Sequence, residues 1–405
     1  MGLKQANPSA SAPFVVLAVL AFFLLHGILI ADGGMLALLK NIVYGSFSDG
    51  SPRYPVNTGN SVLDLMLAQC VSFWTPVVSK STASLLISST LCASLQTVAV
   101  WATIEGLRGG KKHAMLHLAP LTIFFWQYVG TSIVLPLYTI VELRHHFGDG
   151  ASESSKSRNN MALPYAAAQA LIPSAVIALV HPFLTIHYTP AGTTDAQLQT
   201  FVANYHLAGP IYYILIAAAA YTLTNRGTDT TPRPRDADFW WVRATYVSAG
   251  AFSLLIHLDV LRRIAGSREA GVSFVGVFLP SAEIGLPGAA ATQYVKEHLY
   301  FLQWDWVILV LTVALWLART TTALDALRSK RTEEDLHGMA RSVGLLLAYS
   351  LACMLFGFGA VGSAVLYYRE EALRADTVGQ EDMNADEKST PSDAVSTAST
   401  ATPSS

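Results

Sequence analysis

Long apolar segments separated by short polar ones dominate the sequence. A helix needs about 20 apolar residues to cross a bilayer, and eight segments, most of them about that long, have this character. The pattern predicts an all-α fold, a polytopic membrane helix bundle with about eight transmembrane helices. The predicted spans are residues 13–31, 81–105, 113–146, 163–186, 210–223, 239–261, 299–317 and 344–366.

The remaining segments divide the chain into three parts. Residues 1–12 form a polar N-terminal tail, residues 13–367 the transmembrane helical domain, and residues 368–405 an acidic, Ser- and Thr-rich tail without aromatic residues after Tyr368. Such a composition predicts disorder from residue 368 onward. Residues 61–79 are moderately apolar but polar in places, so an interfacial, a re-entrant and a spanning segment all stay open.

Composition supports the membrane class and narrows the partners. Hydrophobic residues make up 52% of the chain and charged residues only 13%, which is typical of polytopic helical membrane proteins. A net charge of −2 argues against nucleic acid as a partner. The three cysteines lie in apolar stretches and lack the spacing of a disulfide framework or a metal site.

The third predicted span, residues 113–146, carries a polar face. At about 100° per residue, Phe124, Gln127, Thr131, Tyr138 and Glu142 fall on one side of a helix. Lipid cannot satisfy an amide, a hydroxyl or a carboxyl, so this face should line a pocket. Gln127 is either a donor in that pocket or a link between helices. Glu142 is either a functional acid or an interfacial charge.

Asp305 is the strongest candidate for a catalytic acid. It lies within the seventh predicted span, between Trp304 and Trp306. Burial disfavours the charged form of a carboxyl, and a protonated carboxyl is what a general acid requires. The alternative is a structural carboxyl bonded to a neighbouring helix.

Two further polar residues of the sixth predicted span have simpler explanations. Asp259 precedes Arg262 and Arg263 by one helical turn, which favours an ion pair at the helix end over catalysis. His257 is more easily explained as a core histidine with satisfied hydrogen bonds than as a functional group.

Many aromatic residues lie in or beside the predicted spans. Ring faces stabilise cations by about 0.5–2 kcal/mol each, so aromatic walls around a buried acid would suit carbocation chemistry. Core packing and interfacial belts are the alternative. We predict substrate contacts from the following side chains: Gln127, Trp126, Tyr138, Tyr246, His257, Phe301 and Trp304.

Several motifs do not support a metal or a cofactor. The stretch GFGAVG at residues 357–362 has the spacing of a dinucleotide-binding loop, but it lies inside an apolar helix, where close helix packing explains it better. The histidines do not complete a membrane di-iron set, and no aspartate-rich diphosphate motif occurs. We therefore expect no metal and no cofactor.

Two stretches carry a resemblance to a known family. FFWQYVGTSIVLPLYTIVELRHH, together with EHLYFLQWDWVI, resembles the fungal membrane-bound terpene cyclases of meroterpenoid pathways, of the ascofuranone and macrophorin cyclase type. The resemblance covers roughly residues 10–370. It implies a multi-pass protein of the endoplasmic reticulum and a farnesylated phenol, quinone or polyketide as substrate. It also implies a reaction that begins by protonation of a terminal epoxide or olefin, without a redox cofactor.

The resulting hypothesis is a metal-independent terpene cyclase of the isomerase or lyase type in secondary metabolism. Asp305 is the leading proton donor, and Glu142 and Asp259 are the other candidate acids. The expected partners are a prenylated small molecule and the lipid bilayer, with other membrane enzymes of the pathway as candidates. A transporter for a small apolar metabolite is the main alternative, and a membrane oxidoreductase that uses the histidines is a third.

Overall fold

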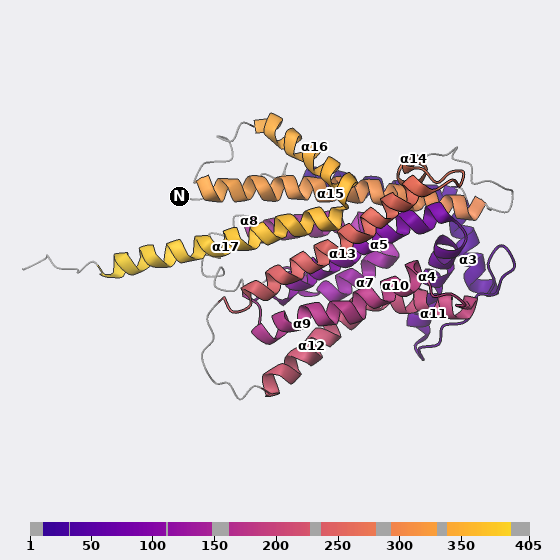
Figure 1. Cartoon of the computed structure of the whole chain (residues 1–405), viewed down its shortest axis with the longest axis horizontal. Helices are drawn as coiled ribbons and strands as arrows, with labels where there is room; N and C mark the ends of the chain where they lie inside the picture. The colour runs from indigo at the N-terminus through magenta and orange to yellow at the C-terminus, as the bar shows by residue number, and fades with distance from the viewer. Residues whose placement is uncertain are drawn as a thin grey trace, which may run out of the picture.

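The computed structural model describes residues 11–31, 33–110, 112–147, 162–226, 236–280, 293–329 and 338–389. Within these ranges the secondary structure is helical, and the prediction of an all-α fold is confirmed. Figure 1 shows the long helices lying side by side along the longest axis of the molecule, with α3 and α11 near the right-hand end. The α-helices are α1 (Ala12–Phe22), α2 (Ile28–Ala31), α3 (Gly34–Tyr44), α4 (Ser61–Ser79), α5 (Thr82–Leu107), α6 (Ala114–His117), α7 (Ala119–Val129), α8 (Thr131–Phe147), α9 (Tyr165–Ala175), α10 (His181–His187), α11 (Asp195–His206), α12 (Ala208–Arg226), α13 (Phe239–Gly266), α14 (Phe274–Phe278), α15 (Gln293–Ser329), α16 (Gly338–Phe356) and α17 (Phe358–Ser389).

Six helical segments among the described residues are long and apolar enough to cross a membrane, which is compatible with a membrane protein. A seventh would be the pair α11 and α12, which meet at an angle of 60°. The α4 segment, left open by the sequence, is one of the six. The predicted number of eight spans is not confirmed among the described residues: glycines break two of the predicted spans, and residues 210–223 qualify only together with α11. The six segments are Ala12–Ala31, Ser61–Ser79, Thr82–Leu107, Tyr165–His187, Phe239–Gly266 and Lys296–Ala326.

The third predicted span breaks at Gly130, between α7 and α8. Gly130 has φ of 108°, a backbone conformation that residues with a Cβ atom rarely adopt. A straight helix through residues 113–146 was therefore the wrong expectation. Of the predicted polar face, Thr131, Tyr138 and Glu142 still lie on one helix, α8, and all three are buried.

The last predicted span breaks at Gly357, which has φ of 81° and separates α16 from α17. Beyond it α17 packs beside α13 (Figure 1). Gly359 lies in this contact, where an added Cβ would approach Ser253 to 2.4 Å. Gly362 faces α5 instead, where an added Cβ would approach the Trp101 ring to 2.2 Å. Close helix packing therefore explains the glycine motif, as the sequence predicted.

The helix α17 also continues past the predicted domain boundary at residue 368. Arg369 and Glu370 are fully buried, and Arg374 is nearly so. Composition suggested disorder there because charged residues are rarely buried. These side chains are buried because each meets an opposite charge on another helix or on the segment before α13. Residues 390–405 of the predicted tail lie outside the described residues.

The helix α5 forms the centre of the bundle. Almost all of its residues are buried, and many are Ser, Thr or Ala, whose small side chains let neighbouring helices approach closely. The helices α13, α15 and α17 all pack against it. Large apolar side chains such as Val16, Leu255 and Leu347 are instead exposed on outer helices, as expected of surfaces that face lipid.

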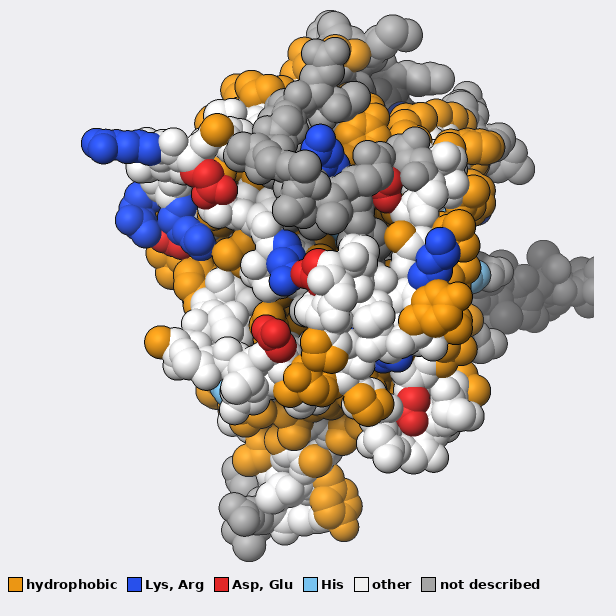
Figure 2. Space-filling view, turned by 90° about the vertical axis from the view of Figure 1, so that its right-hand side faces the viewer, with side chains coloured by type: hydrophobic (Ala, Val, Ile, Leu, Met, Phe, Trp, Pro, Cys, Tyr) orange, Lys and Arg blue, Asp and Glu red, His pale blue; other side chains and the backbone are white. Residues whose placement is uncertain are grey.

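One end of the molecule differs from these apolar sides. Figure 2 shows the face at the right-hand end of Figure 1, where charged and polar side chains are scattered over the surface and hydrophobic side chains lie along its edges. This distribution suits an end that projects into water while the long helices lie in an apolar medium.

The glycine contacts lead to a stability prediction. Gly362→Ala places a methyl group against Trp101, whose indole is held by a 2.9 Å hydrogen bond to Ser363 and by stacking on Trp316. We expect a loss of about 1–3 kcal/mol in the free energy of unfolding from overpacking, measured as a lower Tm of the detergent-solubilised protein. Gly344→Ala is the control, because its Cβ meets nothing within 4 Å. Equal Tm values for both variants would contradict the packing.

Candidate active site

The larger of the two cavities described here has a volume of about 980 Å³ and lies among α4, α5, α7, α8, α11 and α15. Apolar and aromatic side chains form most of its wall, with a few polar groups between them. We call it the main cavity.

Asp305 lies in the wall of the main cavity and is only 5% exposed. Its Oδ1 accepts a hydrogen bond of 3.2 Å from the backbone N–H of Ser132, the second residue of α8. The break at Gly130 thus places the N-terminus of α8, with its partial positive charge, against the carboxyl. The ion pairs of the described residues use other carboxylates. Asp305 therefore combines an apolar setting with a donor that stabilises its charged form.

A row of aromatic rings continues from Asp305 along the cavity wall. Phe301 lies one helical turn before Asp305, and its ring centroid is 5.2 Å from that of Phe73. Phe73 contacts Trp74 at 5.4 Å, and Trp74 contacts the imidazole of His206 at 5.8 Å. All of these residues line the main cavity. The arrangement offers successive ring faces to a positive charge that moves through the cavity.

Gln127 and Trp126 also line the main cavity, as predicted for substrate contacts. The Gln127 amide donates to the carbonyl of His206 at 3.2 Å and, at 3.5 Å, to that of Ile123. Gln127 therefore faces the cavity and at the same time links α7 to the end of α11. The link between helices is thus present, and the role of Gln127 as a donor to a bound molecule stays a prediction.

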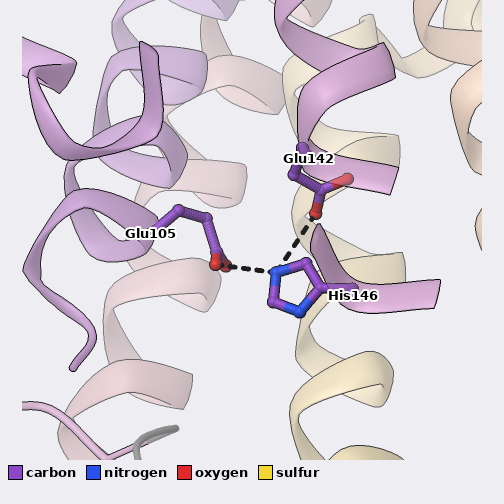
Figure 3. A group of neighbouring side chains, drawn as sticks. All are labelled: Glu105, Glu142 and His146. Carbon is purple, nitrogen blue, oxygen red and sulfur yellow. Dashed lines mark hydrogen bonds and ion pairs between the residues drawn. The ribbon is translucent and has the colours of Figure 1, made fainter. Parts of the chain in front are cut away.

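Glu142 belongs to a second, smaller cavity of about 370 Å³, together with Tyr138, Glu105 and Arg369. Figure 3 shows the side chains of Glu105, Glu142 and His146 pointing toward one another. The His146 Nε2 lies 2.9 Å from a Glu105 oxygen and 3.7 Å from a Glu142 oxygen.

Arginines neutralise this group of acids. Arg369 donates to both Glu105 and Glu142, and Trp316 donates to the second Glu142 oxygen at 2.8 Å. Arg108 connects Glu105 to Glu370, at 3.1 Å and 2.5 Å. We call the whole set the buried ionic cluster; its members are Glu105, Arg108, Glu142, His146, Asp238, Arg369, Glu370 and Arg374.

The arginines of the buried ionic cluster keep the Glu370 carboxyl ionised. Burial on its own would raise the pKa of Glu370, but Arg108, Arg374 and Arg369 outweigh it, so that the pKa lies below its ordinary value. A carboxylate held in this way by guanidinium groups is a poor proton donor. The cluster is therefore suited to joining helices rather than to acid catalysis.

Glu105, Glu142 and His146 are also ligand types that a metal ion could use, with ligand atoms within 4.8 Å of one another. However, both carboxylates already accept hydrogen bonds from Arg369, so an ion would have to displace a guanidinium group. The donor set therefore fits a structural ion pair better than a metal centre.

The two leading acids do not share a site. At roughly 1.5 Å per residue, Glu142 lies about 15 Å beyond Ser132 along α8, and Ser132 contacts Asp305. Asp259, the third candidate, does not line either cavity. Its carboxylate pairs with the exposed Arg262 at 2.7 Å and accepts a hydrogen bond from the Tyr188 hydroxyl at 2.9 Å. It forms the helix-end ion pair that was the simpler expectation.

Three predicted substrate contacts also lie outside the walls of the two cavities described above. His257 has both ring nitrogens bonded, to the Thr90 hydroxyl at 2.6 Å and the Met354 carbonyl at 3.0 Å, and is a core histidine. Tyr246 is fully buried in helix packing, and Trp304 is half-buried on α15. Phe301, Trp126 and Gln127 are thus the predicted contacts that the structure places in the main cavity, and Tyr138 lies in the smaller one.

Sequence reasoning missed other residues of these sites. Arg369 and Arg374 were assigned to a disordered tail, although buried acids such as Glu105 and Glu142 require cations and these arginines follow directly after the last apolar segment. His206 was also passed over, because it lies at the end of a helix of ordinary polarity.

The comparison with known families bears on this geometry. A model described as the CtvD domain matches residues 11–374, which include both cavities and the buried ionic cluster. The chain belongs to the CtvD domain family.

Three proteins that are similar to this chain are named as terpene cyclases. The chain is 25% identical over 347 residues to "Terpene cyclase DEP1" of Alternaria brassicicola, covering 81% of this chain and 89% of the relative. It is 21% identical to "Terpene cyclase DEP1" of Fusarium langsethiae, with the same two shares, and 21% identical to "Terpene cyclase ascI" of Acremonium egyptiacum, covering 74% and 77%. No solved structure matches. The predicted resemblance to fungal terpene cyclases is confirmed.

The buried ionic cluster leads to the second stability prediction. Arg369→Met removes the cation shared by Glu105 and Glu142 and leaves two carboxylates buried together. Glu105 keeps its pair with Arg108, whereas Glu142 loses its guanidinium partner. Because an unpaired buried charge costs about 3–5 kcal/mol, we expect a large drop in Tm of the detergent-solubilised protein.

The matched control is Arg262→Met, which breaks the exposed pair with Asp259. Exposed pairs contribute only about 0–1 kcal/mol, so its Tm should stay close to wild type. Similar Tm values for the two variants would show that the cluster does not hold the helices together.

Proposed function

We propose that the protein is an integral membrane terpene cyclase of secondary metabolism. In this proposal it protonates the terminal epoxide or olefin of a farnesylated aromatic or polyketide precursor and cyclises the resulting carbocation. The names of its relatives support the cyclase activity. The observation that carries the mechanism is Asp305: a buried carboxyl without an arginine partner among the described residues, at the wall of a large aromatic cavity.

The reaction starts with proton transfer from the Asp305 carboxyl. The proton goes to the epoxide oxygen, whose C–O bond then breaks, or to a terminal alkene carbon, whose π bond supplies the electron pair. The Ser132 N–H and the N-terminus of α8 stabilise the carboxylate that remains. Internal double bonds of the substrate attack the cation in turn, and Phe301, Phe73 and Trp74 offer ring faces along its course.

The cavity suits a prenylated substrate because its wall is mainly apolar, with a few polar groups that could orient the aromatic head. Three helices of membrane length, α4, α5 and α15, contribute to its wall, so a farnesylated precursor dissolved in the bilayer could enter laterally. A multi-pass protein of the endoplasmic reticulum membrane is the corresponding location, where other membrane enzymes of the pathway are candidate partners. The proton replaces a metal as the initiator, so the proposed reaction requires no metal ion.

The acid assignment is tested by Asp305→Asn, which keeps the size of the side chain and removes the proton. Microsomes that carry each variant would be incubated with a farnesyl phenol and, separately, with its terminal epoxide, and products would be separated by mass. We expect wild type to yield a cyclic product of unchanged mass. Asp305→Asn should lose at least about 100-fold in rate, the lower end of general-acid contributions.

Asp325→Asn is the control, since Asp325 lies on the same helix but pairs with Arg341 outside the cavity. It should cyclise at the wild-type rate. An Asp305→Asn rate equal to wild type would refute the acid assignment. Absence of product from wild type on a panel of prenyl phenols, with expression verified, would favour transport of an apolar metabolite instead.

Metal independence has its own test. The wild-type rate should be unchanged in the presence of a chelator that binds divalent cations tightly, because Asp305 supplies the proton without a Lewis acid. The readout is the rate of formation of the cyclic product before and after chelation. A loss of activity that added Mg²⁺ restores would contradict this part of the proposal.

A further inference from the structure

A histidine that the proposed initiation does not use lies in the wall of the same cavity. His206 is the last residue of α11, directly before the 60° bend into α12, and is 1% exposed. Trp74 packs against its ring, and Gln127 holds its backbone carbonyl. Its side chain lines the main cavity, as Asp305 does.

The hydrogen bonds of His206 define its tautomer. Its Nδ1 lies 2.7 Å from the carbonyl oxygen of Val202, and a carbonyl can only accept, so Nδ1 carries a hydrogen. Its Nε2 has no hydrogen-bond partner among the described residues. In a neutral imidazole this nitrogen presents a lone pair. A buried acceptor without a partner is costly. Because His206 belongs to the wall of the main cavity, a molecule bound there is the candidate partner for this nitrogen.

The reaction proposed above requires such an acceptor. Protonation creates a positive charge at one end of the substrate, and an isomerisation of unchanged mass must remove one proton at the end of the cascade. The aromatic row Phe301, Phe73, Trp74 leads from the turn that holds Asp305 to the ring of His206. Along the cavity wall, the Asp305 carboxyl is thus followed by the aromatic rings and then by the imidazole of His206.

Resting on the proposed function, we propose that Nε2 of His206 is the base that ends the cyclisation. It takes a proton from a carbon next to the final cation; the C–H bond breaks, its electron pair forms the new C=C bond, and the imidazole becomes imidazolium. The proton gained by His206 equals the one given up by Asp305, so the cavity then holds a carboxylate and an imidazolium. Return of that proton to Asp305 restores the starting state.

The test uses His206→Asn in the microsomal assay. The Asn side-chain amide lies near the position of Nδ1 and can still donate to Val202, while the basic nitrogen is lost. Because termination follows the step that consumes substrate, we expect consumption close to wild type. The normal cyclic alkene should fall at least about tenfold as a share of products, given the usual size of general-base effects. Alcohols heavier by one water, or alkenes with the double bond elsewhere, should replace it.

His187→Asn is a closely matched control. His187 is also buried, its Nδ1 also lies near the carbonyl of the residue one turn earlier, and its Nε2 also has no partner among the described residues. It does not belong to the wall of the main cavity. The product distribution of His187→Asn should therefore equal that of wild type. His206→Gln serves as a second variant if His206→Asn does not accumulate as folded protein.

The outcomes separate the two proposals. Wild-type products at the wild-type rate from His206→Asn, with Asp305→Asn inactive, would overturn the role of His206 and leave the cyclase intact. A lower rate or higher KM with unchanged products would also overturn it, and would show that His206 only orients the substrate. A wild-type protein that forms no cyclic product would overturn both proposals.

Discussion

A carboxyl group inside an apolar bundle has to be balanced by a cation, by directed hydrogen-bond donors or by a bound proton, because its bare charge is too costly there. This molecule uses the first solution around Glu105 and Glu142, where Arg369 and Arg108 surround the acids. It uses a different one at Asp305, which meets a single backbone donor at the start of a helix. The difference separates the acids held in ion pairs from Asp305, which we propose as the proton donor.

Both solutions depend on glycines that interrupt apolar helices. The break at Gly130 creates the free N-terminus of α8 that reaches Asp305, and without it the Ser132 N–H would be bonded within a continuous helix. The break at Gly357 turns the chain back so that α17 brings Arg369 to the acids of α5 and α8. In each case a backbone conformation that suits glycine brings a hydrogen-bond donor or a cation to a carboxyl group inside the apolar bundle.

These breaks also explain what the sequence could and could not predict. Apolar length was enough to foresee an all-helical bundle, and the isolation of Asp305 in an apolar segment was enough to select it. Gly130 and Gly357 looked like ordinary small residues of membrane helices, since sequence does not reveal φ. Arg369 looked like part of a soluble tail, because its burial depends on partners more than 220 positions away, which local patterns do not report.

Sequence patterns also failed to show which buried histidine lies in the main cavity, for a related reason. His257 and His206 are both buried beside aromatic residues, and spacing does not distinguish them. The structure does, because Thr90 and Met354 use both nitrogens of His257, whereas Val202 uses only one of His206. A cyclase that conserves mass needs a proton source and a proton sink in one enclosed space, and it must keep them from neutralising each other directly. In the mechanism that we propose, the aromatic residues between Asp305 and His206 meet that requirement, since ring faces stabilise a cation that moves along them but cannot themselves carry the proton.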